Sequence, residues 1–253
     1  MRSIVFAKRT GKEILRDPLT FVFSLGFPIL MLIIMTVIDR SLPPEAGMEI
    51  FHLPYLAPGI TIFGLTFIML FTCLQVSKDR STAFLIRLYA SPMKPGDFVA
   101  GYTLPLLGIA LLQTIITFAA AFITAAITGD TLHLGNVALG IILSIPAALL
   151  FLSFGMLFGT ILNEKAAPGI CSILITAASM LGGIWMDVDA LGGTLLDICK
   201  ILPFYHCVKT VRLAVLGNFS QIGAPLAVTC IYAVVIYLLA VLALRYRMQQ
   251  DVK

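Results

Sequence analysis

Charged side chains are scarce in this sequence. Asp, Glu, Lys and Arg make up 12% of the 253 residues, whereas hydrophobic residues make up 59% and the mean hydropathy is +1.01. Soluble domains have about 25% charged residues, so a water-facing globular surface is excluded. The net charge of +4 comes from Lys and Arg clusters between apolar runs, which is typical of membrane topology signals rather than of nucleic-acid binding. We therefore expect a polytopic, all-α membrane protein with no nucleic-acid partner.

Motifs for chemistry within the chain are also missing. The only Lys followed by Ser or Thr is Lys209, which no glycine-rich phosphate loop precedes, and neither HExxH nor GxSxG occurs. The chain is therefore not expected to be an enzyme or to bind a cofactor of its own. The five cysteines form no CxxC pair and predict no metal site, although the spacing of Cys199 and Cys207 leaves a disulfide between these two open.

What the sequence does contain is six long uncharged stretches. About 20 helical residues cross a ~30 Å hydrocarbon core, so each stretch is long enough to span a membrane. The expected spans cover residues 18–38, 54–77, 99–128, 135–162, 166–186 and 223–244. Before the first span, apolar residues recur at near-helical spacing between Lys8, Arg9, Lys12 and Arg16. This pattern favours an interfacial helix in contact with membrane lipid over a frayed basic tail.

The distribution of Lys and Arg predicts the orientation of the chain. With the N-terminus in the cytoplasm, thirteen of the 17 Lys and Arg residues lie on the inner side and four on the outer side. Positively charged residues in short loops favour the cytoplasmic side of a membrane. Because an even number of spans returns the chain to its starting side, we expect both termini to be cytoplasmic. The protein is expected to lie in the plasma membrane of a bacterium.

Ionisable side chains are absent from the six expected spans. Ion-coupled pumps usually carry such groups at depth, so any transport by this chain is expected to draw its energy from outside it. Two spans instead carry stripes of small polar residues, which indicate either the wall of a substrate path or close helix packing. These residues are Thr61, Thr72 and Gln75 in the second span and Ser172, Thr176 and Ser179 in the fifth.

The loop after the second span is the longest inner loop between spans. Phe84, Leu85 and Leu88 give residues 79–91 an apolar face at helical spacing, and Pro92 ends this expected helix. A loop that only connects two spans needs no such face. We therefore expect a short helix that docks into a partner.

This loop resembles the first inner loop of the permease subunits of type 2 ATP-binding-cassette (ABC) exporters. The family pattern begins with Asp/Glu-Arg, has a Gly-Thr-Leu-Glu-Arg-Leu-like middle and ends with Ser/Thr-Pro. The matching residues here are Asp79, Arg80, Leu85, Arg87, Leu88, Ser91 and Pro92, while Ala83 and Ile86 depart from the pattern. The resemblance implies a coupling helix that docks into a separate ATPase subunit. We expect Phe84 and Leu88 to be its anchors, because aromatic and aliphatic anchors dominate interface energies.

A second segment, residues 202–212, is similar to the Asn-Pro-x-x-Tyr-x-x-x-x-x-Arg segment that precedes the last span in this family. Pro203 and Arg212 match, and other positions depart from the pattern. Pro203 also separates two apolar pieces that are each too short to span a membrane. The resemblance implies a re-entrant outer helical hairpin between the fifth and sixth spans, over residues 188–216, with Tyr205 near the outer boundary.

Together, these resemblances imply the membrane subunit of an ABC exporter. It would pair with a second permease, as a homodimer or a paralogous heterodimer, and with two ATPase subunits that hold ATP and Mg²⁺. The implied substrate is amphipathic, such as a drug, an antibiotic, an antimicrobial peptide or a lipid-like molecule. Export of polysaccharide or teichoic-acid chains, ATP-independent secondary transport and a membrane-embedded scaffold are the alternatives.

Overall fold

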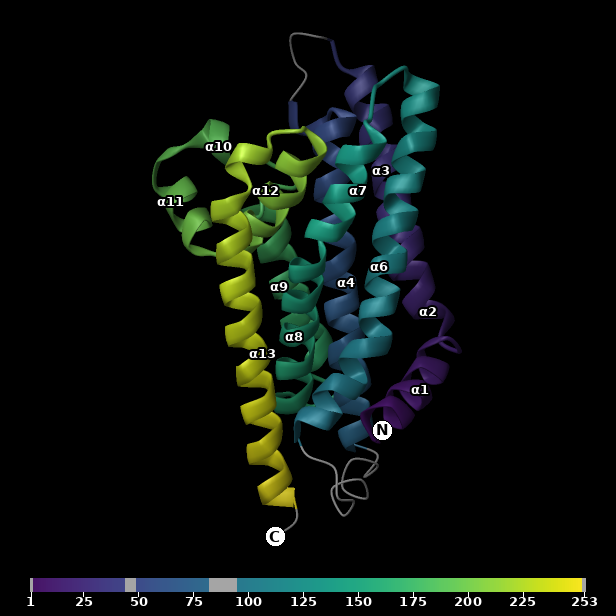
Figure 1. Cartoon of the computed structure of the whole chain (residues 1–253), viewed down its shortest axis with the longest axis vertical. Coiled ribbons are helices and arrows are strands. Elements are labelled where there is room, and N and C mark those ends of the chain that lie inside the picture. The colour runs from purple at the N-terminus through teal and green to yellow at the C-terminus, as the bar shows by residue number, and fades with distance from the viewer. Residues whose placement is uncertain (1, 44–48, 82–94, 252–253) are drawn as a thin grey trace.

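The computed structural model describes residues 2–43, 49–81 and 95–251, and every regular element in these ranges is helical (Figure 1). In chain order the elements are α1 (Arg2–Ile14), α2 (Pro18–Phe21), a π-helical segment (Val22–Gly26), α3 (Phe27–Ser41), α4 (Leu53–Ser81), α6 (Pro95–Thr128), α7 (Leu134–Leu143) and α8 (Ile145–Ile161). They continue with α9 (Ala167–Leu181), α10 (Val188–Leu191), α11 (Gly193–Ile201), α12 (Pro203–Val215) and α13 (Gly223–Asp251), with short 3-10 turns at Glu49–Phe51 and Phe219–Gln221.

Five of these helical stretches are long and apolar enough to cross a membrane, which confirms the expectation of a polytopic membrane protein. They are Pro18–Ser41, Leu53–Ser81, Pro95–Thr128, Leu134–Ile161 and Gly223–Gln249. The expected span over residues 166–186 is shorter than predicted, because α9 has 15 residues and ends at Leu181. Gly182 and Gly183 follow it, and Gly183 has a φ of +71°, which no longer fits a right-handed helix.

Both termini lie at the same end of the bundle (Figure 1). Near that end, the Arg80 side chain at the close of α4 bonds to the carbonyl of Leu162, which follows α8 and precedes α9. At the other end, Arg212 bonds to the carbonyls of Gly183, after α9, and Tyr55, at the start of α4. The short helix α9 therefore runs between the two ends of α4.

The helix α4 forms the centre of the bundle and is buried over most of its length. Two glycines of α8 allow the two helices to approach closely. A Cβ atom at Gly155 would lie 2.5 Å from the carbonyl oxygen of Met69, and one at Gly159 would lie 2.7 Å from that of Cys73. Small residues four apart on a membrane helix permit such backbone contact, so the α4–α8 pair is held by close packing.

Local sequence signals explain several helix boundaries. Asp17 caps α2 by accepting hydrogen bonds from the backbone N–H of Leu19 (3.2 Å) and the hydroxyl of Thr20 (2.7 Å). The outer segment breaks where the sequence predicted, since α11 ends at Ile201 and α12 begins at Pro203. It contains three short helices instead of the expected two.

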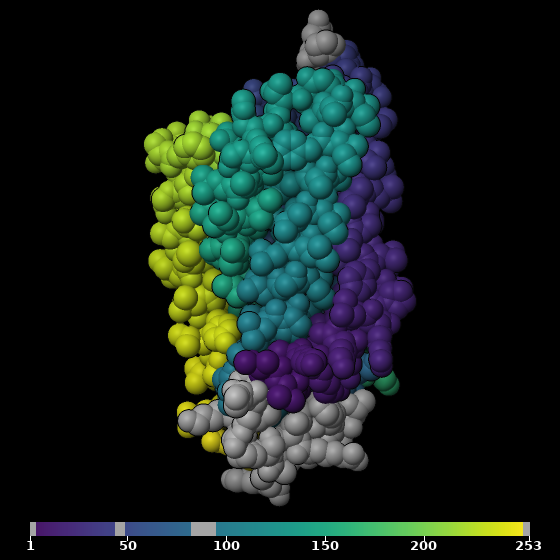
Figure 2. All heavy atoms as spheres, turned by 45° about the vertical axis from the view of Figure 1, so that its right-hand side comes forward, coloured from purple at the N-terminus to yellow at the C-terminus, as the bar shows by residue number. Residues whose placement is uncertain are grey.

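Large apolar side chains are exposed around the outside of the bundle. Ile127 and Ile123 on α6 are 81% and 65% exposed, and Ile231 and Leu238 on α13 are 62% and 55% exposed. Such a surface is suited to hydrocarbon and not to water. Figure 2 shows α6 over much of one face, with α1 lying across its lower end.

Candidate functional site

The expected coupling helix is only partly within the described residues. Those outside them are Phe84, Leu85, Arg87, Leu88 and Pro92. Asp79 and Arg80 are described, and they belong to the last turns of α4, which continues to Ser81. The predicted helix start at residue 79 is therefore corrected: contacts with neighbouring helices hold this charged segment as part of α4.

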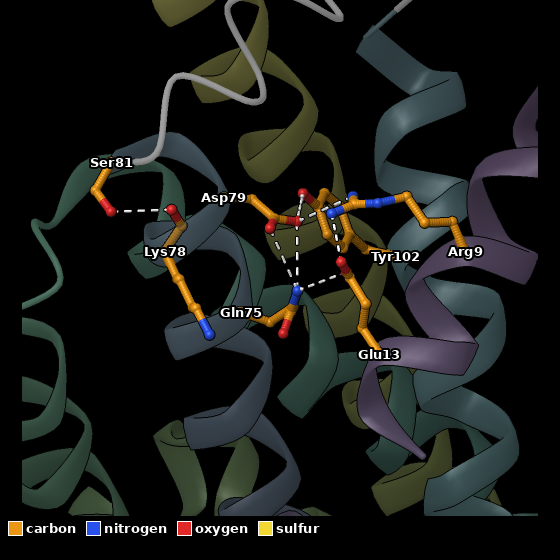
Figure 3. Close-up of polar contacts among 7 residues, drawn as sticks. All are labelled: Arg9, Glu13, Gln75, Lys78, Asp79, Ser81 and Tyr102. Carbon is orange, nitrogen blue, oxygen red and sulfur yellow. Dashed lines mark hydrogen bonds and ion pairs between the residues drawn. The ribbon is translucent and has the colours of Figure 1, made fainter. Parts of the chain in front are cut away.

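Asp79 is only 5% exposed and lies at the centre of a polar network at the end of the bundle that holds the termini (Figure 3). The hydroxyl of Tyr102 on α6 donates a hydrogen bond to Asp79 Oδ2 at 2.7 Å. The amide of Gln75, one turn earlier on α4, donates to both carboxylate oxygens at 3.4 Å. Arg9 Nη1 on α1 lies 3.7 Å from Asp79 Oδ2. Three helices thus meet at one carboxylate, immediately before the inner loop.

The N-terminal helix α1 is attached to this network by polar and aromatic contacts. Arg9 forms an ion pair with Glu13 at 2.5 Å, and Gln75 Nε2 donates to Glu13 Oε2 at 3.3 Å. On the neighbouring face of α1, the Phe6 ring meets the Tyr102 ring edge-on, with centroids 4.9 Å apart. The helix α1 is therefore fixed to both α4 and α6 and does not form a frayed tail.

Arg80 joins α4 to the end of α8. Its Nη2 donates to the carbonyl of Leu162 at 2.6 Å, and its Nη1 donates to the carbonyl of Thr160. The hydroxyl of Ser81 donates to Glu164 at 3.0 Å. Carbonyls at a helix C-terminus lack partners within the helix and attract cations. The Arg80 side chain, which the sequence placed in the coupling helix, therefore caps α8.

The polar stripe of the second span, formed by Thr61, Thr72 and Gln75, lies within the helix bundle. Thr61 and Thr72 are 0% exposed, and their hydroxyls donate to the carbonyls of Ala57 (2.9 Å) and Ile68 (2.7 Å) on the same helix. Gln75 is occupied by the network around Asp79. Thr72 also lies in the contact with α8, because a Cβ at Gly155 would be 2.7 Å from Thr72 Cβ. In the described arrangement these residues pack helices together.

The fifth-span stripe differs, because part of it faces outward. Ser172 and Thr176 are exposed, and Ser179 is buried. Their hydroxyls bond to carbonyls of α9 itself, at 2.8 to 3.0 Å. Ile173, beside them, is 72% exposed. The helix α9 therefore presents a mixed polar and apolar face that the described parts of this chain leave uncovered.

The outer residues singled out from the sequence lie on α12. Pro203 and Tyr205 are buried, and the Tyr205 hydroxyl donates to Asp189 Oδ1 at 2.6 Å. Lys209 donates to the same hydroxyl and lies 3.5 Å from Asp189. Sequence reasoning did not select Asp189 and Lys209, because only the fold brings α10 beside α12.

Arg212 connects the start of α4 to the end of α9, at the end of the bundle opposite the termini. Its Nε donates to the carbonyl of Tyr55 at 3.3 Å, its Nη2 donates to the carbonyl of Gly183 at 3.0 Å, and its guanidinium lies 5.9 Å from the centroid of the Tyr55 ring. The two ends of the bundle therefore each contain a polar cluster anchored on α4. Within the described ranges, no group of three or more His, Cys, Asp or Glu side chains is arranged to hold a metal ion.

Comparison with known protein families gives a match to the family described as ABC-2 type transporter, over residues 3–216. The matched region contains α1, the network around Asp79, α9 and the outer cluster on α12. No curated protein matches the chain. The family match covers most of the chain and confirms the family that the sequence resemblance implied. The chain therefore belongs to the ABC-2 type transporter family, as a membrane permease subunit that works with a separate ATPase subunit.

Proposed function

We propose that this permease forms one half of the membrane pathway of an exporter that moves an amphipathic substrate out of a bacterial cell. A second copy or a paralogous permease supplies the other half, and two ATPase subunits with ATP and Mg²⁺ supply the energy. The observation that supports this proposal best is the buried Asp79 network. It holds α1, α4 and α6 together at the point where the chain enters the inner loop.

In the proposed coupling, this network attaches the inner loop rigidly to α1, α4 and α6. A movement of the docked ATPase can reach an outer pathway only through contacts that transmit rigid-body motion. Phe84 and Leu88 anchor the loop in the ATPase, and Asp79 passes the movement to three helices together. The six uncharged stretches of the sequence carry no Asp, Glu, Lys, Arg or His that would let an ion gradient replace ATP.

The substrate path is proposed to run along the exposed face of α9, the helix of the expected fifth span. Ser172 and Thr176 provide hydroxyls on that face, and the buried Ser179 continues the stripe toward the interior of the bundle. Ile173 provides an apolar side chain on the exposed face for the substrate to contact. A molecule with polar and apolar parts suits such a surface. One permease supplies a single wall, so the corresponding face of the second permease completes the path.

The orientation is proposed from the Lys and Arg count, with both termini in the cytoplasm. Lys165 lies between α8 and α9, Asp197 lies on α11, and both are exposed. In intact cells, a membrane-impermeant thiol reagent should label Asp197→Cys and should label Lys165→Cys only after permeabilisation. The opposite labelling pattern would reverse the orientation.

The coupling assignment is tested by the double variant Phe84→Ala with Leu88→Ala. Truncating interface anchors often costs about 2 kcal/mol or more each, so the variant should insert in the membrane but no longer co-purify with its ATPase. The matched control is Leu238→Ala with Leu242→Ala, which truncates two side chains that are 55% and 56% exposed on α13. Co-purification of the loop variant at wild-type yield, together with normal transport, would falsify the assignment.

The substrate class is tested with the purified complex in sealed vesicles. ATP-dependent movement of an amphipathic drug, a peptide or a lipid-like probe supports the proposal. Movement of only polysaccharide or teichoic-acid chains would show that the substrate is not amphipathic, and it would not affect the proposed coupling to the ATPase. Movement without ATP or without an ATPase would identify a secondary transporter, and no movement of any of these molecules would favour a scaffold.

A further inference from the structure

The end of the bundle opposite the termini contains a cavity of about 230 Å³ that the proposed coupling does not use. Its lining residues come from the start of α4 and the turn before it, from the connection between α9 and α10, from α10 itself, and from α12 and the residues after it. Its charged lining consists of Glu49, Asp187, Asp189, Lys209 and Arg212. Charges of both signs thus face a space that has room for several water molecules, at ~30 Å³ each.

Arg212 brings a positive charge that forms no direct ion pair in the described chain, although Asp187 and Asp189 attract it from a greater distance. A guanidinium has five N–H donors. Two of its nitrogens bond to the neutral carbonyls of Tyr55 and Gly183. Among the described residues, no carboxylate oxygen lies within 4.0 Å of it. Arg212 is partly buried, and a charge withdrawn from water is costly unless it is matched, so its remaining donors at the cavity surface favour an anionic group.

The acidic residues of the lining divide into matched and unmatched groups. Asp189 is matched, because it lies 3.5 Å from Lys209 and accepts a hydrogen bond from Tyr205. Asp187 accepts hydrogen bonds from two backbone N–H groups of α10, at 3.0 and 3.1 Å. Neither Asp187 nor Glu49 has a cationic side chain within 4.0 Å in the described parts of the chain. Within the described residues, the lining therefore offers one positive and two negative groups that are unmatched in the sense that no ion pair of 4.0 Å or less involves them, and Glu49 is also exposed.

This combination selects against simple ions. An anion drawn to Arg212 would be repelled by Asp187 and Glu49, and a cation drawn to these acids would be repelled by Arg212. We infer that the cavity binds a zwitterionic group, with its phosphate or carboxylate on Arg212 and its ammonium on Asp187 and Glu49. Phosphoethanolamine has this chemistry, either as the headgroup of an outer-leaflet lipid or as a free molecule. The inference is independent of the exported substrate and of ATPase docking.

The test uses the full-length permease in nanodiscs. One preparation contains phosphatidylglycerol alone, and a second contains an equal amount of phosphatidylethanolamine. Native mass spectrometry measures which lipid remains bound, and thermal unfolding in the first preparation measures the response to soluble phosphoethanolamine. The variant Asp187→Asn with Glu49→Gln removes both unmatched acids and keeps a capping side chain on α10. Asp197→Asn is the matched control, because Asp197 is exposed on α11 and outside the cavity lining.

The wild type and Asp197→Asn should retain phosphatidylethanolamine selectively, and the double variant should bind the headgroup at least tenfold more weakly. Stabilisation by soluble phosphoethanolamine would identify a free zwitterion as a ligand, whereas retention of the lipid alone would identify the headgroup. Equal retention of both lipids with no effect of soluble phosphoethanolamine, or unchanged binding by the double variant, would overturn the inference. Arg212 is left intact in this test because its bonds to Tyr55 and Gly183 also hold α4 and α9.

Discussion

Replacing Tyr102 by Phe removes one hydroxyl from the Asp79 network and keeps the ring that packs on Phe6. The lost hydrogen bond is 2.7 Å long and ends on a carboxylate that is 5% exposed. Hydrogen bonds to charged groups contribute about 1.5–3 kcal/mol, so we expect the free energy of unfolding to fall by that amount. At about 2–4 °C per kcal/mol, Tm should fall by about 3–12 °C.

The assay compares thermal unfolding of the purified permease with that of Tyr246→Phe. Tyr246 is 63% exposed near the end of α13, and its hydroxyl has no hydrogen-bond partner among the described residues. Removing it should change stability by no more than about 0.5 kcal/mol. In the complex, Tyr102→Phe should also reduce substrate-stimulated ATP hydrolysis at a temperature where the permease remains folded. Equal Tm values for the two variants would refute the role given to the buried hydrogen bond.

Three further outcomes are expected. Gly155→Ala places a Cβ 2.5 Å from a carbonyl of α4 and should cost about 1–3 kcal/mol in thermal unfolding, whereas Gly108→Ala, which meets nothing within 4 Å, should be neutral or stabilising. Burial alone would raise the pKa of the Asp130 carboxyl, but hydrogen bonds from its neighbours, including Arg40, hold the pKa below its usual value. Arg40→Ala should therefore cost less than about 1 kcal/mol at neutral pH, and its effect on Tm should disappear as the pH falls through that lowered pKa. Thr176→Phe should leave protein level unchanged, because this site is exposed, and should alter which substrates are exported; a collapse in protein level would instead indicate a packing role.

The membrane-spanning helices were largely predictable because they depend on local composition. An uncharged stretch of about 20 residues has few alternatives to a spanning helix. The break at Pro203 was predictable for the same reason, since proline disrupts a helix from within. Gly182 and Gly183 also mark the end of α9 in the sequence. The span was nevertheless predicted to continue to Met186, because the residues after these glycines are uncharged and mostly apolar.

The polar clusters were not predictable, because their members come from distant parts of the sequence. Nothing near Asp79 indicates that Arg9, 70 positions earlier, lies 3.7 Å away. Charged residues flanking a span are ordinarily solvated, so Asp79 and Arg80 resembled the beginning of a loop helix. Their burial and their helix-capping contacts depend on α6 and α8, whose positions local patterns do not specify. The outer cavity likewise requires three separate segments to meet.

The contacts of α1 also bear on how the chain is made. Phe6 packs on Tyr102, so the ribosome must add 96 residues after Phe6 before that ring exists. At ~5–20 residues per second, this interval lasts about 5–20 s. During that time the first helix can rest on the membrane surface but cannot reach its final position. An arrested nascent chain that ends before α6 should leave α1 open to proteolysis, and a longer one that includes Tyr102 should protect it.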